Sequence, residues 1–265
     1  MAKAIAHPDA PYLGRAVSTA GQLLRLLEEQ GLSGKSEQRV IDDPEFRIAL
    51  AVWWETNANP GLSVDGCTLG QAAQVMGDNF LGPVAVRRCF DPELTRQSVF
   101  KSVPFSIQQL EEVRETHVLV AISALSLIDL FRMNRDLFHH VFFLPKRTWF
   151  TQGDYPFAHE KPEVGWYLVR TSVVPGSKKK TWDEMLELLE PNEFVPSASV
   201  LVQAAFLQYL WNHKRFLRDW FLASDTTSLG SHLMLFHEDS GLHVYGSNPK
   251  TVSGVTGLAS AIRAT

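Results

Sequence analysis

The sequence predicts an α+β fold, in which a helical N-terminal part precedes a mixed part with a small, mainly antiparallel sheet. Two observations predict it. Capped helical patterns fill residues 1–104, and β-branched and aromatic runs typical of strands dominate from residue 165 onward. No repeat with a period of about 20 to 50 residues is present, so a solenoid is not indicated.

The N-terminal region, residues 1–104, is predicted to consist mostly of short helices. They correspond to STAGQLLRLLEEQG, DDPEFRIALAVWWET, TLGQAAQVMG and the stretch that Pro83 opens. Thr68 and Gln71 have the spacing of a capping box, and Gly77 is placed to end that helix. Asp43 and Pro44 are typical of a helix start in the second segment.

Residues 105–265 are predicted to form an α+β domain that begins near the Val103-Pro104 seam, although a single domain over the whole chain is an alternative. Ser106 and Gln109 form a second capping box. HVLVAI is predicted to be a short buried strand and SALSLIDLFRMN a helix, with one continuous helix through both as an alternative.

Strands and two helices are predicted for the last hundred residues. GWYLVRTSVV and RFLRDWFLAS have strand composition, and SHLMLFHEDSGLHVYGS is predicted to be a hairpin that turns at Asp239-Ser240-Gly241. TWDEMLELLE and SASVLVQAAFLQYLWNH are predicted to be helices between the strands.

Composition and charge favour a cytoplasmic protein without a membrane partner. The chain has 25 basic and 29 acidic residues, a net charge of −4, which gives no overall attraction for nucleic acid or anionic lipid. Two cysteines are too few for a disulfide framework. The start of the chain has no secretory signal pattern, and the apolar stretch VLVAISALSLIDLF is shorter than the roughly 18 residues of a membrane span.

The turn SKKKTW is a candidate ligand or anion site. Lys178, Lys179 and Lys180 precede Thr181, which forms a third capping box with Glu184. Positive charges beside a helix N-terminus suit an anion. The alternative is a solvated turn that only connects a strand to a helix.

Five further basic residues are nucleic-acid candidates, provided that they gather on one face: Arg87, Arg88, Lys214, Arg215 and Arg218. The helical segments 68–77 and 83–90 have the order of a helix-turn-helix, with Arg87 and Arg88 toward a DNA groove. Two arginines in an acidic chain supply little basic surface, so two helices that simply pack together are favoured.

Histidine and acidic residues in FHEDSGLH resemble the composition of a metal site. His237, Asp239 and His243 are candidate catalytic residues of a metal-assisted hydrolase or nuclease, because a hairpin turn would bring the two histidines opposite each other. No H-x-x-x-H or C-x-x-C spacing accompanies them, so no metal ligand and no cofactor are assigned.

The segments GWYLVR, SKKKTW and VPSA carry a resemblance. Over about the last hundred residues the chain resembles a group of uncharacterised bacterial proteins that share a G-W-Y-L-x-R pattern and a lysine-containing turn before Thr-Trp. The resemblance implies that the protein comes from a bacterium or from a bacterial mobile element. It implies no activity.

A non-catalytic binding or regulatory protein is the leading hypothesis. No complete catalytic motif is present, and the chain has 7 Trp, 16 Phe and 5 Tyr, which are residue types that cores and interfaces both use. An aromatic-rich surface would then contact another protein, while nucleic-acid binding and metal-assisted hydrolysis are the alternatives. The sequence sets no oligomeric state.

Overall fold

A computed structural model describes residues 66–90, 98–133, 155–218, 220–226, 232–238, 241–247 and 254–263. The chain divides into two units between Asn59 and Pro60, and all described residues belong to the second. The first two predicted helices therefore lie outside the described residues. The described part contains both helices and mixed sheets, which confirms the α+β class.

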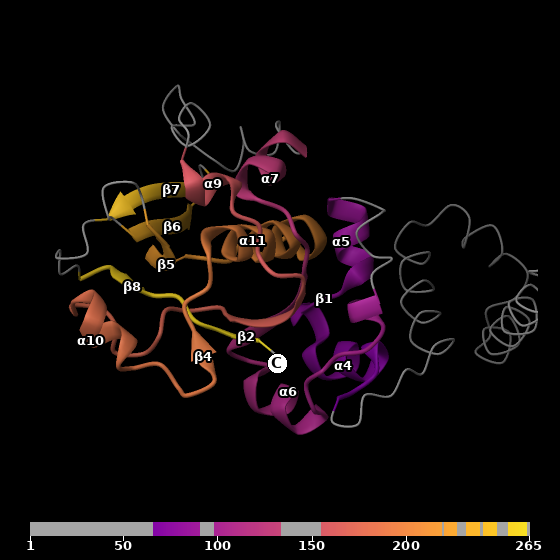
Figure 1. Ribbon diagram of the computed structural model, residues 1–265. Coiled ribbons are helices and arrows are strands. Elements are labelled where there is room, and N and C mark those ends of the chain that lie inside the picture. Colours follow the sequence, from indigo (N-terminus) through magenta and orange to yellow (C-terminus); the bar gives the residue numbers. More distant parts are fainter. Residues whose placement is uncertain are drawn as a thin grey trace, which may run out of the picture. The chain divides into compact units, whose positions relative to one another are not determined.

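Among the described residues the strands form two sheets (Figure 1). The first has the order β1-β2-β3-β9-β4, formed by Phe80–Leu81, His117–Ile122, Gly165–Arg170, Ala261–Arg263 and Glu193–Phe194. The second has the order β7-β6-β5-β8, formed by Gly241–Ser247, His232–Glu238, Trp220–Thr226 and Thr256–Leu258. Only β1–β2 and β5–β8 pair in parallel, so both sheets are mainly antiparallel, as predicted.

The described helices surround and separate the sheets. They are α4 (Leu69–Met76), α5 (Pro83–Cys89), α6 (Ile107–Val113), α7 (Leu127–Met133), α9 (Pro156–His159), α10 (Trp182–Leu186) and α11 (Ala198–Asn212), with short 3-10 helices η1 (Gly77–Asn79) and η3 (Ser98–Phe100). The capping boxes at Thr68, Ser106 and Thr181 are all formed, which confirms three predicted helix starts. HVLVAI is β2, so the alternative of a continuous helix is wrong.

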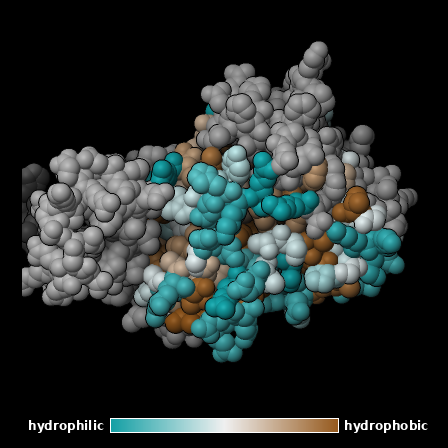
Figure 2. Space-filling model, turned by 180° about the vertical axis from the view of Figure 1, so that it is seen from behind, coloured by the Kyte–Doolittle hydropathy of each residue, from teal (hydrophilic) through white to brown (hydrophobic). Residues whose placement is uncertain are grey.

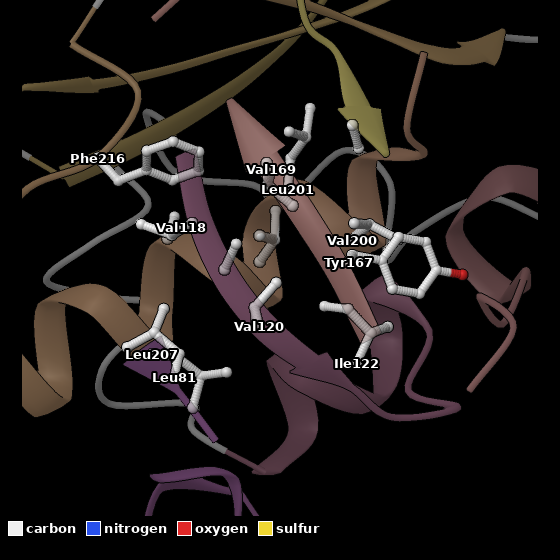
Figure 3. Packing of buried hydrophobic residues seen from close by; sticks show 14 of the residues in the cluster. Leu81, Val118, Val120, Ile122, Tyr167, Val169, Val200, Leu201, Leu207 and Phe216 are labelled. Carbon is white, nitrogen blue, oxygen red and sulfur yellow. The ribbon is translucent and has the colours of Figure 1, made fainter. Parts of the chain in front are cut away.

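Helix α11 is the centre of the fold. It is buried from Ala198 to Gln208, and it packs against β1 and β2 of the first sheet and β5 of the second. A helix that is apolar on all sides is stable only when other elements cover all of it. Figure 3 shows Val118, Val120 and Ile122 of β2 on the face toward this helix. Alternate residues of one strand thus supply one side of the core.

The opposite face of the first sheet packs on aromatic side chains. Trp166 of β3 stacks on Phe80 at 5.8 Å between ring centroids and meets Phe100 edge-on at 5.9 Å. Because β1 lies before the predicted Val103-Pro104 seam and pairs with β2 after it, the two sides of that seam share one sheet. A bridge between Cys67 and Val103 and the packing of α4 on α6 join them further.

Gly257 of β8 occupies a position where a larger residue cannot fit. A Cβ atom there would lie 2.6 Å from Val173 Cβ and 2.7 Å from Ser177 Oγ, and that hydroxyl accepts a hydrogen bond from Leu258 N. We expect Gly257→Ala to lower the free energy of unfolding by about 1–3 kcal/mol, since overpacking forces backbone shifts. Urea denaturation measures it.

Gly254 is the matched control for this substitution. A Cβ at Gly254 would make only an ordinary contact, 3.8 Å from Lys179 Cε, and the residue is exposed. Gly254→Ala is therefore expected to change stability by less than about 0.5 kcal/mol. Equal losses for the two variants would contradict the close packing at Gly257.

Candidate functional site

A largely buried polar cluster lies on the first sheet, around Arg170, Glu193 and Ser260. Arg170 donates from Nη2 to Glu193 Oε1 at 2.8 Å and from Nε to Ser260 Oγ at 3.0 Å, and Ser260 Oγ donates to the same carboxylate at 2.9 Å. His117 pairs with Arg170 across β2 and β3. Ser260 and His117 are buried. The hydrogen bonds given above join Arg170, Glu193 and Ser260 to one another. The cluster therefore joins β3 and β4 to the two-residue connection before β9, and its hydrogen bonds are made within the fold.

Burial sets the ionisation of this cluster. Burial and, to a lesser extent, the nearby Arg170 charge together lower the pKa of His117 to about 4, while Glu193 opposes the shift. Thr116 Oγ1 lies 2.8 Å from His117 Nδ1, and the Nε2 atom is buried without a described partner. Burial works against the charged form of Glu193, but hydrogen bonds from Arg170, Glu190 and Ser260 hold its pKa below the ordinary value.

The lysine turn is a connection between β3 and a short helix. Thr181 accepts from Glu184 N, and Glu184 accepts from Thr181 N at 2.7 Å, so the capping box accounts for the helix start. Helix α10 has five residues, and Lys178, Lys179 and Lys180 are exposed or partly exposed beside it. These observations match the solvated-turn alternative, and the anion site at Lys178–Thr181 stays a prediction.

Replacing Lys178, Lys179 and Lys180 with serine is expected to change the free energy of unfolding by less than about 0.5 kcal/mol. The reason is that Thr181 and Glu184 satisfy the helix start without the lysines. Thermal unfolding monitored by circular dichroism measures the change. A loss well above 1 kcal/mol would show that the lysine side chains support the fold.

The His237 hairpin forms, but its register differs from the expectation. His237 pairs with Leu242 and His243 pairs with Phe236. Paired residues share a face and successive residues alternate. Positions 237 and 243 therefore fall on opposite faces of the hairpin and not opposite each other as expected, while Asp239 lies outside the described residues. No group of histidine, cysteine and acidic residues able to hold a metal occurs among the residues that the structure describes.

The structure brings Arg88 and Lys214 to one end of α11, beside Trp211. The Arg88 guanidinium lies over the Trp211 ring, 5.8 Å from its centroid. Lys214 Nζ donates to Asp78 Oδ2 at 2.8 Å, and Lys214 follows the end of α11, where His213 has a left-handed backbone. Helices α5 and α11 are in contact (Figure 1). We name Arg88, Trp211 and Lys214 the α11 end surface.

A polar pocket of about 230 Å³ adjoins the α11 end surface. Its walls come from the end of α4, from η1, from the residues that follow α6, and from Lys214. Its lining residues are Gln74, Val75, Met76, Gly77, Asp78, Asn79, Arg114, Glu115 and Lys214. Asn79 Nδ2 donates to the carbonyl of Arg114 at 2.7 Å, and Asn212 donates to the carbonyl of Asp78. These bonds fix the pocket wall to the end of α11.

The other predicted basic residues are divided between two places. Arg87 is exposed next to Arg88, and Arg215 is exposed next to Lys214. Arg218 is exposed further along the segment that leads to β5, and Lys178–Lys180 lie beside α10, at the other end of the described part from α5 in Figure 1. The contacts of the described residues bring together only Arg88 and Lys214 from the predicted set, at the end of α11.

The helix pair that carries Arg87 and Arg88 is not a helix-turn-helix. Helices α4 and α5 are separated by η1 and by β1, and β1 is a strand of the first sheet. A helix-turn-helix joins its two helices by a short turn. Helix α4 packs mainly on α6, and α5 packs mainly on α11, so the two helices are not primarily packed on each other as the alternative expected.

No described aromatic side chain is among the exposed large hydrophobic residues, although the half-buried Trp211 reaches the surface under Arg88. The exposed large hydrophobic residues in the described ranges are Val99, Ile107, Met133, Leu186 and Val255, none of them aromatic. Figure 2 shows a mainly hydrophilic face with small, separate hydrophobic patches. In the described ranges, then, aromatic rings such as Trp166 and Phe206 serve the core, and the aromatic-rich surface of the leading hypothesis is not found there.

Comparison with protein-family models, with curated proteins and with solved structures finds no match for this chain. The resemblance to uncharacterised bacterial proteins stays a prediction, as does the cytoplasmic location. No helix in the described ranges has the length and apolar character that a membrane crossing requires.

Proposed function

We propose that this protein is a non-catalytic binding protein that contacts a partner protein through the α11 end surface and its pocket. The observation that carries the proposal is the position of an arginine, a tryptophan and a polar pocket at one end of the central helix. Arginine and tryptophan are enriched among the residues that dominate binding energy in protein interfaces.

The two helices that carry Trp211 and Arg88 are held by packing, which favours binding. Trp211 belongs to α11, which is buried over most of its length, and Arg88 belongs to α5, which packs on it. Side chains held on packed helices lose less conformational entropy when a partner binds. The exposed large hydrophobic residues in the described ranges are few, which favours a partner contact through polar and charged side chains over one through a large apolar surface.

A capture experiment with the full chain tests the proposal. Wild type, Arg88→Ala with Lys214→Ala, and the control with Lys178, Lys179 and Lys180 changed to serine are compared as bait in an extract of the source cell. We expect one protein band that the control retains and the double variant loses. A partner that both variants retain, or that both lose, would overturn the assignment of this surface.

A further inference from the structure

We infer that the partner segment is acidic, and that its carboxylates bind Arg88 and Lys214 on the α11 end surface. This inference rests on the proposed function, because it names the chemistry of that same contact. The described charged residues that the structure places at Trp211 and the pocket are Arg88, Arg114 and Lys214, with the acidic residues Asp78 and Glu115. Among these described side chains the positive charges outnumber the negative ones, although the net charge of the chain is −4.

Lys214 already binds one carboxylate. Its ammonium lies 2.8 Å from Asp78 Oδ2, although the two side chains are 54% and 70% exposed. An exposed ion pair of this kind contributes little to stability, about 0–1 kcal/mol. A partner carboxylate can therefore compete for Lys214 at small cost, and Asp78 acts as an internal competitor for the same position.

The pocket is suited to a side chain of a protein partner. Its volume of about 230 Å³ is below the roughly 300–1,000 Å³ typical of small-molecule sites. Arg114 and Glu115 form an ion pair at 3.3 Å on one wall, and Lys214 and Asp78 form another. The rim of a protein–protein interface is polar. This mixed polar lining is therefore more typical of such a rim than of a site for an apolar ligand.

Nucleic acid is the less favoured polyanion. Single-stranded nucleic acid is commonly held by bases that stack on aromatic rings, but the Arg88 guanidinium covers a face of Trp211. The lysines of the SKKKTW turn, which would have extended a basic track, lie at the other end of the fold.

Compensation of the helix dipole is an alternative explanation for part of the surface. Positive residues after a helix C-terminus stabilise it, and this accounts for Lys214 and Arg215 at the end of α11. It does not account for Arg88, which belongs to α5, or for the pocket. The substitution Asp78→Asn separates the two explanations, since it removes a competitor for acidic ligands without removing any positive charge.

The probe is a fluorescein-labelled peptide rich in glutamate, compared with a peptide in which glutamine replaces each glutamate, and with single-stranded oligothymidylate. Fluorescence anisotropy of the full chain gives Kd at about 50 and 200 mM salt. The variants are Arg88→Glu with Lys214→Glu, the milder Arg88→Gln with Lys214→Gln, and Asp78→Asn. Lys178→Glu with Lys180→Glu is the charge-matched control, and circular dichroism confirms folding.

We expect the glutamate peptide to bind, and the reversal of Arg88 and Lys214 to weaken it at least about tenfold, since each exposed pair contributes up to about 1 kcal/mol. Asp78→Asn should tighten binding about two- to threefold, and the control should change it less than about twofold because salt screens distant charges. The glutamine peptide should bind more weakly than the glutamate peptide.

Any of three results would overturn the inference: no binding of the glutamate peptide at low salt, equal weakening by the control, or tighter binding of oligothymidylate through the same arginine and lysine. If the peptide fails while the captured protein still depends on Arg88 and Lys214, the acidic chemistry is wrong and the proposed function stands. If both fail, the surface itself is wrongly assigned.

Discussion

Replacing Glu193 with alanine is expected to lower the free energy of unfolding by about 3–5 kcal/mol, because it leaves a buried cation unpaired. The Glu193 side chain is 2% exposed and that of Arg170 is 17% exposed. The substitution removes the acceptor of both Arg170 Nη2 and Ser260 Oγ, so β3 and the residue before β9 lose their common polar contact with β4. Chemical denaturation measures the loss.

Two controls make this result specific to the buried pair. The double variant Arg170→Met with Glu193→Leu removes both charges and should be more stable than Glu193→Ala, since no buried charge remains. Lys214→Ala breaks an exposed pair and should cost less than about 1 kcal/mol. A loss below 1 kcal/mol for Glu193→Ala would contradict the burial of the pair.

Acid is expected to destabilise the protein through His117. Its pKa is about 4 in the folded chain, against an ordinary value of 6.5. Between these values the unfolded chain binds more protons than the folded one, so stability falls as the pH falls. The contribution is fully present above about pH 6.5, is lost progressively down to about pH 4, and amounts to about 3 kcal/mol at about 1.36 kcal/mol per pKa unit.

His117→Gln isolates this contribution. The variant keeps a polar side chain at the position but does not titrate, so its unfolding free energy should depend less on pH between about 4 and 6.5. Urea titrations of both proteins across that range give the difference in slope. Glu193 and the other titratable groups are present in both proteins, so their titration contributes to both slopes. Identical slopes would show that His117 is not buried as a neutral group.

Local signals predicted the described elements that depend on neighbouring residues. Each of the capping boxes at Thr68, Ser106 and Thr181 joins residues three apart, so the sequence alone contains the whole motif. The hairpin of β6 and β7 was predictable for the same reason. The strand predicted over 215–224 instead begins at Trp220, because Leu217 is buried with a left-handed backbone of φ 62°.

Short strands without a local pattern escaped prediction. β1, β4, β8 and β9 have two or three residues each, and they exist because they pair with distant strands. β8 joins the second sheet and β9 the first, although only Ala259 and Ser260 separate them. A short stretch of sequence does not show which strands β8 and β9 pair with, because the whole fold brings those partners together.

The candidate site was predictable only in part. Arg87, Arg88, Lys214 and Arg215 were recognised as basic residues, but their division from Lys178–Lys180 depends on the packing of α5 against α11. Trp211, Asp78 and the pocket carried no sequence signal. Trp211 lies in the last turn of a continuous apolar helix, so its pattern predicts a core residue, and Asp78 has the pattern of an ordinary residue after a helix.

Hydrogen–deuterium exchange of the full chain, alone and with the captured partner, tests most directly whether the α11 end surface is the binding site. We expect partner-dependent protection of the backbone amides of Gly77–Asn79, Arg87–Cys89 and Asn212–Arg215, which border the pocket and Trp211. Protection confined to other segments, such as Lys178–Thr181 beside α10, would contradict the account.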